Sequence, residues 1–139
     1  MWVLAASVAL VVAAGAGLWA GLANLAPTSI ATASLDAFPD HPQAVGSAEV
    51  DEARDGTRTL TVTLQGAADP DAYREVWLIR SDGAALISLG VLDDETGRFP
   101  IPPGVDLGEY DLVDISFEPV DGDPAHSGDS IVRGQLSFA

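Results

Sequence analysis

The distribution of charge divides this chain into two parts and limits what each part can fold into. None of the first 35 residues is charged, whereas the other 104 residues hold all 21 acidic residues and all six arginines. A helix over Trp2–Leu25 would be about 36 Å long at ~1.5 Å per residue, enough to cross a hydrocarbon core of ~30 Å. We therefore expect a transmembrane helix over residues 1–26 and an acidic domain after it.

Two interpretations of the apolar segment are open: a permanent anchor, and a signal peptide that is removed. Ala31–Ala33 has the small residues of a cleavage site, and Ser34 would then begin the mature protein. However, the run Trp2–Leu25 is longer than the ~7–15 apolar residues of a signal peptide, and no basic residue precedes it. We expect a single-pass anchor in the cell membrane. The missing basic residues leave open whether Met1 is the natural start.

Three small residues, Ala13, Gly17 and Gly21, recur at every fourth position and would share one face of this helix. Such a face lets two membrane helices approach closely and pack. The alternative is that the pattern reflects only how common glycine and alanine are in membrane helices, since the motif often occurs by chance. These residues are therefore a candidate helix-packing face.

The acidic part, residues 36–139, is long enough for one domain with one modest core. The chain has no cysteine, so it has neither disulfides nor thiolate ligands. Its formal net charge is −15, it has no lysine, and its six arginines are scattered among the acids. This balance excludes a phosphate-neutralising patch, so we expect no binding to nucleic acid or to anionic lipid. The acidity is most simply a source of solubility.

The hydrophobic pattern of the acidic part has period two, which is typical of half-buried β-strands. In Thr57–Leu64, apolar side chains alternate with threonines. Tyr73–Arg80 is apolar on both faces, which predicts a central strand. Tyr73, Trp77 and Ile79 share one of these faces, and we expect the core of the domain to be centred on them.

Turn-forming sequences separate further short strands at regular intervals, and no amphipathic helix is evident after residue 26. Six to eight strands of this kind predict an all-β fold, an antiparallel Ig-like β-sandwich over residues 46–139, with a small barrel as the alternative. Residues 27–45 contain three prolines and predict a linker between the helix and the domain. Part of it, Ala33–Phe38, could pair as a first strand.

The acidic part has no recognisable catalytic motif. Ser127 cannot form a nucleophile–base pair with the adjacent His126, because neighbouring side chains on an extended chain point apart. Residues 93–95 and 121–123 carry the oxygen ligands that calcium uses, but neither cluster has the spacing of a calcium loop. Aspartates also occur in turns simply because they accept hydrogen bonds from nearby backbone amides. We expect no enzymatic activity, no cofactor and no metal.

Asp114 lies between Val113 and Ile115 in an otherwise apolar stretch. If it faces inward it needs a partner, because an isolated buried carboxylate is unfavourable. Arg133, on the last expected strand, would be a suitable partner. The alternative is that Asp114 lies on a solvent-exposed face, so a buried Asp114–Arg133 pair is one of two open interpretations.

Three stretches of the acidic part carry a family resemblance. They are Tyr73–Ile79 (YREVWLI), Ser88–Leu92 (SLGVL) followed by Gly97–Phe99 (GRF), and Ile115–Pro119 (ISFEP) followed by Asp121-Gly122. Over about residues 45–138 the chain resembles the C-terminal extracytoplasmic domain of the anti-sigma-K factor family. The helix expected just before it fits the layout of that family.

The resemblance implies a non-catalytic regulatory domain outside the cell membrane. Members of the family hold a sigma factor inactive with a cytoplasmic domain, and proteolysis outside and then within the membrane releases it. The implied partners are proteases and a membrane or envelope protein, and we expect a sigma factor to bind only a cytoplasmic domain absent from this chain. The linker, residues 27–46, is the expected cleavage zone. The alternative is a secreted or anchored binding module unrelated to transcription.

Overall fold

The computed structural model describes residues 25–139, and these residues form β-strands joined by turns and loops, with no helix among them. The strands are β1 Thr28–Ala37, β2 Val45–Glu52, β3 Arg58–Gln65, β4 Ala72–Ile79, β5 Leu86–Val91, β6 Thr96–Ile101, β7 Leu112–Pro119, β8 Ser130–Gln135 and β9 Ser137–Phe138.

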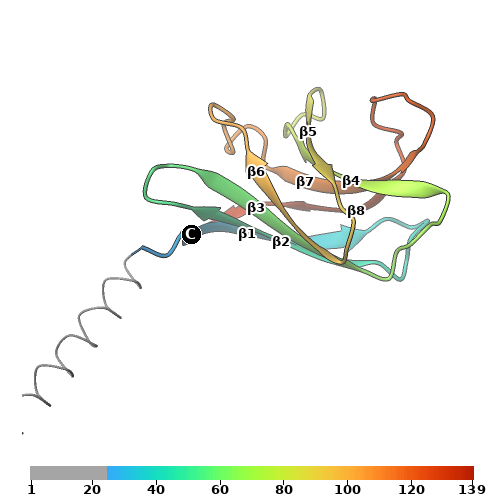
Figure 1. Cartoon of the computed structure of the whole chain (residues 1–139), viewed down its shortest axis with the longest axis horizontal. Coiled ribbons are helices and arrows are strands. Elements are labelled where there is room, and N and C mark those ends of the chain that lie inside the picture. The colour runs from blue at the N-terminus through green and yellow to red at the C-terminus, as the bar shows by residue number, and fades with distance from the viewer. Residues whose placement is uncertain (1–24) are drawn as a thin grey trace, which may run out of the picture.

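All of these strands belong to one antiparallel sheet, in the order β5-β4-β7-β8-β1-β2-β3-β6, with β9 also beside β1. β1 connects the two halves of the sheet, because it pairs with β2 along most of its length and with β8 at its C-terminal end. The sheet curls so that its halves face each other, and a short turn joins its end strands β5 and β6 (Figure 1). The result is a nearly closed, barrel-like fold.

The expected all-β antiparallel fold is therefore confirmed. The described strands form one continuous sheet and not the two separate sheets of an Ig-like sandwich, which brings the fold closer to the small barrel alternative. The reason is that the long strand β1 takes part in both halves.

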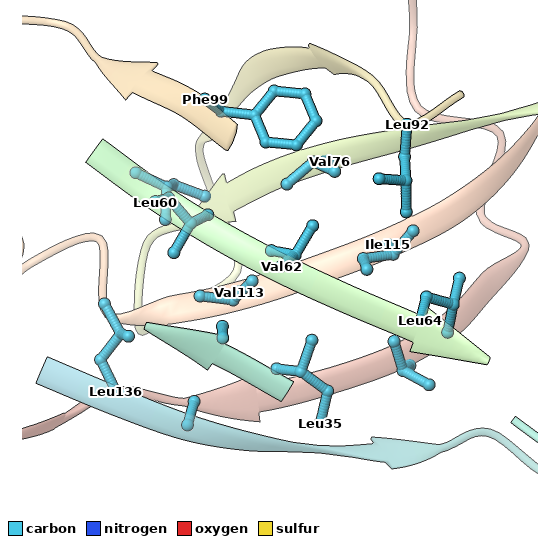
Figure 2. Close-up of a cluster of buried hydrophobic side chains, with 14 of the residues drawn as sticks. Leu35, Leu60, Val62, Leu64, Val76, Leu92, Phe99, Val113, Ile115 and Leu136 are labelled. Carbon is cyan, nitrogen blue, oxygen red and sulfur yellow. The ribbon is translucent and has the colours of Figure 1, made fainter. Parts of the chain in front are cut away.

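The interior of the barrel is filled by the inward-facing residues of alternating strands. On β3 the side chains of Leu60, Val62 and Leu64 are completely buried, while the threonines between them face outward, as the alternation predicts. Figure 2 shows these side chains meeting Val113 and Ile115 of β7 across the interior. The buried apolar cluster is what holds the two halves of the sheet together.

Residues 27–45, expected to be a linker, are mostly part of the sheet. Strand β1 occupies residues 28–37, and the chain then returns to β2 through a loop with hydrogen-bonded turns. The strand forms because Ala31, Ala33 and Leu35 alternate with polar residues and are buried. Two of these inward residues are alanines, which explains why the period-two signal was weak in the sequence.

The expected transmembrane helix falls almost entirely on residues 1–24, which lie outside the described residues, as do Ala13, Gly17 and Gly21. In residues 25–139 we find no helix with the length and apolar character needed to span a bilayer.

Candidate functional site: a buried polar network beneath the β7–β8 loop

The outer face of β7 carries three polar side chains that are buried. Val113, Ile115 and Phe117 face the barrel interior, so the alternate residues Asp114, Ser116 and Glu118 point the other way. These three have exposed fractions of 0%, 0% and 1%. They are covered because residues 120–129, the β7–β8 loop, fold back and bond to them through His126 and Ser127.

Asp114 is held by two partners. Arg133 lies directly opposite it on β8, and the Arg133 Nε donates to Asp114 Oδ1 at 2.9 Å. The other oxygen, Oδ2, accepts a hydrogen bond from His126 Nε2 at 2.9 Å. The structure thus brings Asp114 and Arg133 together and adds His126, which the sequence analysis did not connect with them. These two hydrogen bonds offset the free energy that the carboxylate loses when it is removed from water.

The tautomer of His126 follows from its hydrogen bonds. Its Nδ1 accepts a bond from the backbone N–H of Gly128 at 2.9 Å, so the ring hydrogen of the neutral form lies on Nε2 and points at Asp114. The ring also packs against Trp77, with centroids 5.0 Å apart. Gly128 has φ +88°, a conformation that favours glycine and turns the loop so that this bond can form.

A second chain of hydrogen bonds runs beside the first. Trp77 Nε1 donates to Ser116 Oγ at 2.9 Å, and Ser116 Oγ donates to Glu118 Oε1 at 2.6 Å. The Glu118 carboxylate accepts the backbone N–H of Ser127, at 3.1 and 3.0 Å from its two oxygens. Together with the Asp114–His126–Arg133 group, we call these residues the polar network. It fixes the β7–β8 loop to the outer face of the sheet.

This arrangement is structural and lacks the geometry of an acyl-transfer site. Asp114 and His126 form an Asp–His pair, but the second nitrogen of His126 accepts a backbone N–H, where a catalytic histidine would face a nucleophile. Ser127 Oγ instead donates to the carbonyl of Phe117 at 2.6 Å. Among the described residues, every buried polar side-chain atom has a hydrogen-bond partner.

The expected core residues lie on the outer layer. Tyr73, Trp77 and Ile79 share one face of β4, and Trp77 and Ile79 are buried, with exposed fractions of 5% and 3%. However, the barrel interior contains Val76 and Leu78, so the expectation of a core centred on Trp77 is wrong. β4 is buried on both faces, and its sequence alone could not show which face points inward.

Tyr73 lies near one end of this outer face and remains partly exposed. It lines a shallow cleft with Arg74 and Asp93. Desolvation raises the pKa of Tyr73 above 10.0, and the negative charge of the nearby Glu75 raises it further.

The two acidic clusters are turns. Asp121 Oδ1 accepts the N–H of Asp123, and Asp123 Oδ1 accepts that of Ala125, both at 2.9 Å. The carbonyl oxygens of Asp93 and Asp94 accept bonds from Arg74. Within residues 25–139 no three acidic or histidine side chains gather as metal ligands.

Sequence reasoning missed His126, Ser116 and Glu118 as members of the network. Polar residues at every second position of β7 resemble a solvent-exposed face, and only the length of the β7–β8 loop hinted that something covers it. His41, expected in the linker, lies in the β1–β2 loop and contacts Asp129, Nε2 to Oδ1, at 2.6 Å. It also packs edge-on against Phe117.

Comparison with known protein families places most of the chain in a described family. The family described as "Anti-sigma-K factor rskA, C-terminal" matches residues 1–130, which include both the apolar N-terminal segment and strands β1 to β7. None of the curated proteins compared with the chain matches it.

Proposed function

The chain belongs to the anti-sigma-K factor C-terminal family, and we propose that it is the extracytoplasmic regulatory part of a membrane-anchored anti-sigma factor. In this proposal it controls the release of a sigma factor through regulated proteolysis. The observation that carries the proposal is that one family model matches the charge-free segment together with strands β1 to β7 of the barrel.

The site geometry supports a regulatory and not a catalytic role. The polar network uses its Asp–His pair and its serines to fasten a loop. The partners of such a domain would be an envelope or membrane protein and the proteases that cut the chain. A sigma factor would be bound by a cytoplasmic domain on the other side of the membrane.

Anchoring and orientation can be tested with single cysteines, because the chain has none of its own. Val120 is 81% exposed, so Val120→Cys should react with a membrane-impermeant maleimide in intact cells. Trp2→Cys should react only after the cells are permeabilised. The full-length protein should also stay in the membrane fraction after an alkaline wash. If Trp2→Cys alone reacts in intact cells, the orientation is the opposite of the one proposed. Soluble protein that begins at Ser34 would show that the apolar segment is a cleaved signal peptide.

The regulatory role requires a separate test in the native host. Deleting residues 28–139 from the chromosomal gene should change transcription from the promoters of the associated sigma factor, measured by RNA sequencing under envelope stress. A matched strain with Val120→Cys should behave like the parent. Unchanged transcription in the deletion strain would favour a binding module without a link to transcription.

A further inference from the structure

The fold protects the part of the expected cleavage zone that lies nearest the apolar segment, residues 28–37, whereas residues 38–44 form the β1–β2 loop. A protease binds its substrate as an extended strand with a free backbone edge, and residues 28–37 are instead paired as β1. Thr28 follows the apolar run Trp2–Leu25 by only two residues, so little unpaired chain remains between that run and the sheet. A cut within residues 28–37 therefore needs a local opening of β1.

The pairing of β1 with β2 is regular in the C-terminal half of β1 and interrupted in its N-terminal half. From Ala33 to Leu35 the register with β2 is regular. At the start of the strand the register shifts between Ser29 and Ala31, so Ile30 is an extra residue without a partner on β2. Such a bulge locally disrupts the ladder.

On its opposite edge, too, the C-terminal half of β1 is covered more tightly than the N-terminal half. Its C-terminal end pairs with β8, and Gly134 lies so close to Ser34 that an added Cβ would meet the Ser34 carbonyl oxygen. Among the described strands, its N-terminal half meets β9 on this side, through the pairs Ala31–Phe138 and Thr32–Ser137. The carbonyl of the bulged Ile30 accepts the N–H of Ala139 at 3.0 Å. Residues 137–139, which we call the latch, are thus the part of residues 25–139 that pairs with this edge.

Side-chain burial also differs between the two halves. The fully buried residue of the N-terminal half is Ala31, a methyl group, beside the partly buried Ile30, whereas Leu35 anchors the C-terminal half. Releasing this half uncovers one methyl group and the buried part of the Ile30 side chain, and leaves Leu35 in place. Ser137 and Phe138 of the latch are both exposed, whereas Leu136 just before them is buried and keeps its own bond to the Asp111 carbonyl. The latch can therefore detach without disturbing the core.

We propose that residues 28–32 are the site of the first proteolytic cut and that the latch controls access to it. When the latch detaches, the bulged start of β1 keeps only its interrupted pairing with β2, and its other backbone edge becomes free to pair with a protease. The cut hydrolyses one peptide bond with one water, and a separate protease catalyses it. The assignment rests on the proposed function, which it deepens by naming the site and its control.

The test locks the latch with a disulfide. Thr32 and Ser137 are opposite each other and both exposed, a geometry that suits Thr32→Cys with Ser137→Cys. The control joins another directly paired position of the same sheet, Glu49→Cys with Thr61→Cys on β2 and β3. The full chain, purified in detergent, is treated with proteinase K, and the initial rate of cutting within residues 28–32 is measured by mass spectrometry.

Oxidation of the latch pair should slow cutting within residues 28–32 at least about tenfold relative to the reduced form, and the control disulfide should have a much smaller effect. Deleting residues 137–139 should raise the same rate about tenfold, because backbone pairing is lost while Leu136 stays in place. Equal protection by the two disulfides would mean that cutting requires global unfolding and would overturn the latch. A deletion without effect on the rate would overturn it too.

The same variants expressed in the native host separate the two proposals. If the latch disulfide controls cutting of the purified chain but transcription in the host is insensitive to deletion of residues 28–139, the latch stands and the anti-sigma function fails.

Discussion

The two faces of β7 are equally buried but are stabilised in opposite ways. On the inner face, Val113 and Ile115 are packed among other apolar side chains. On the outer face, Asp114, Ser116 and Glu118 are buried with hydrogen bonds to polar partners. The β7–β8 loop supplies some of these partners, and β4 and β8 supply the others. Truncating a buried apolar side chain lowers the free energy of unfolding in proportion to the volume that it leaves empty. Removing one partner of a buried hydrogen bond lowers it because the other polar group then has no partner. Substitutions should therefore affect the two layers differently.

The largest changes in stability are expected for two adjacent residues on β4. Trp77 points to the outer face of the sheet, where the polar network lies, and Leu78 points to the barrel interior. We expect Trp77→Ala to lower the free energy of unfolding by ~3–5 kcal/mol and Leu78→Ala by ~2–5 kcal/mol. Chemical denaturation measures both. Hydrogen exchange should distinguish them, since Trp77→Ala frees the β7–β8 loop first. Equal loss of protection throughout the domain in both variants would contradict two separate layers.

Removing the arginine of the network should have the next largest effect. Arg133→Met keeps most of the aliphatic volume but leaves Asp114, which has an exposed fraction of 0%, with His126 as its only partner. Removing one partner of a buried ion pair lowers the free energy of unfolding by ~3–5 kcal/mol. We expect a loss of about 3 kcal/mol for Arg133→Met, because Arg133 is partly exposed. Arg54→Met, at an exposed position, is the matched control and should change stability by less than ~0.5 kcal/mol. Similar values for the two variants would rule out a stabilising role for the pair.

Ser116 should contribute less than the charged members. Ser116→Ala removes the acceptor of Trp77 Nε1 and one of the donors to Glu118. A buried N–H without a partner lowers stability by ~1–3 kcal/mol, so we expect a loss of about 2 kcal/mol. Ser47→Ala, on the exposed side of β2, provides the comparison. If thermal unfolding of Ser116→Ala matches that of the parent, the Trp77–Ser116–Glu118 chain is not a source of stability.

The two layers also differ in how much of them could be predicted from sequence. The alternation of Leu60, Val62 and Leu64 with threonines is a local signal, so the strand and its buried face were both predictable. The burial of Ser116 and Glu118 depends on a loop that returns from residues 120–129, and no local pattern records such a contact. Strand β1 is an intermediate case, because its inward alanines are weak markers and its prolines lie at or beyond its ends. The barrel closure depends on pairings between distant strands, which periodicity does not specify.

The smallest expected effect lies outside both layers, in the turn between β4 and β5. Hydrogen bonds from the Arg80 guanidinium, and then from the Ala84 N–H, lower the pKa of Asp82 from 3.8 to about 2. Because this pKa is lower in the folded state, the interaction stabilises the fold above pH 4 and is lost as the pH falls toward 2. The pair is solvent-exposed, so Asp82→Asn should lower the melting temperature at pH 7 by no more than about 2 °C. The difference from the parent should shrink between pH 4 and pH 2.5, and Asp40→Asn, in the exposed β1–β2 loop, serves as control. If Asp82→Asn lowers the melting temperature at pH 7 as much as Ser116→Ala does, the exposed ion pair stabilises the fold as much as the buried network. Covered and exposed polar groups would then not differ in their contribution to stability.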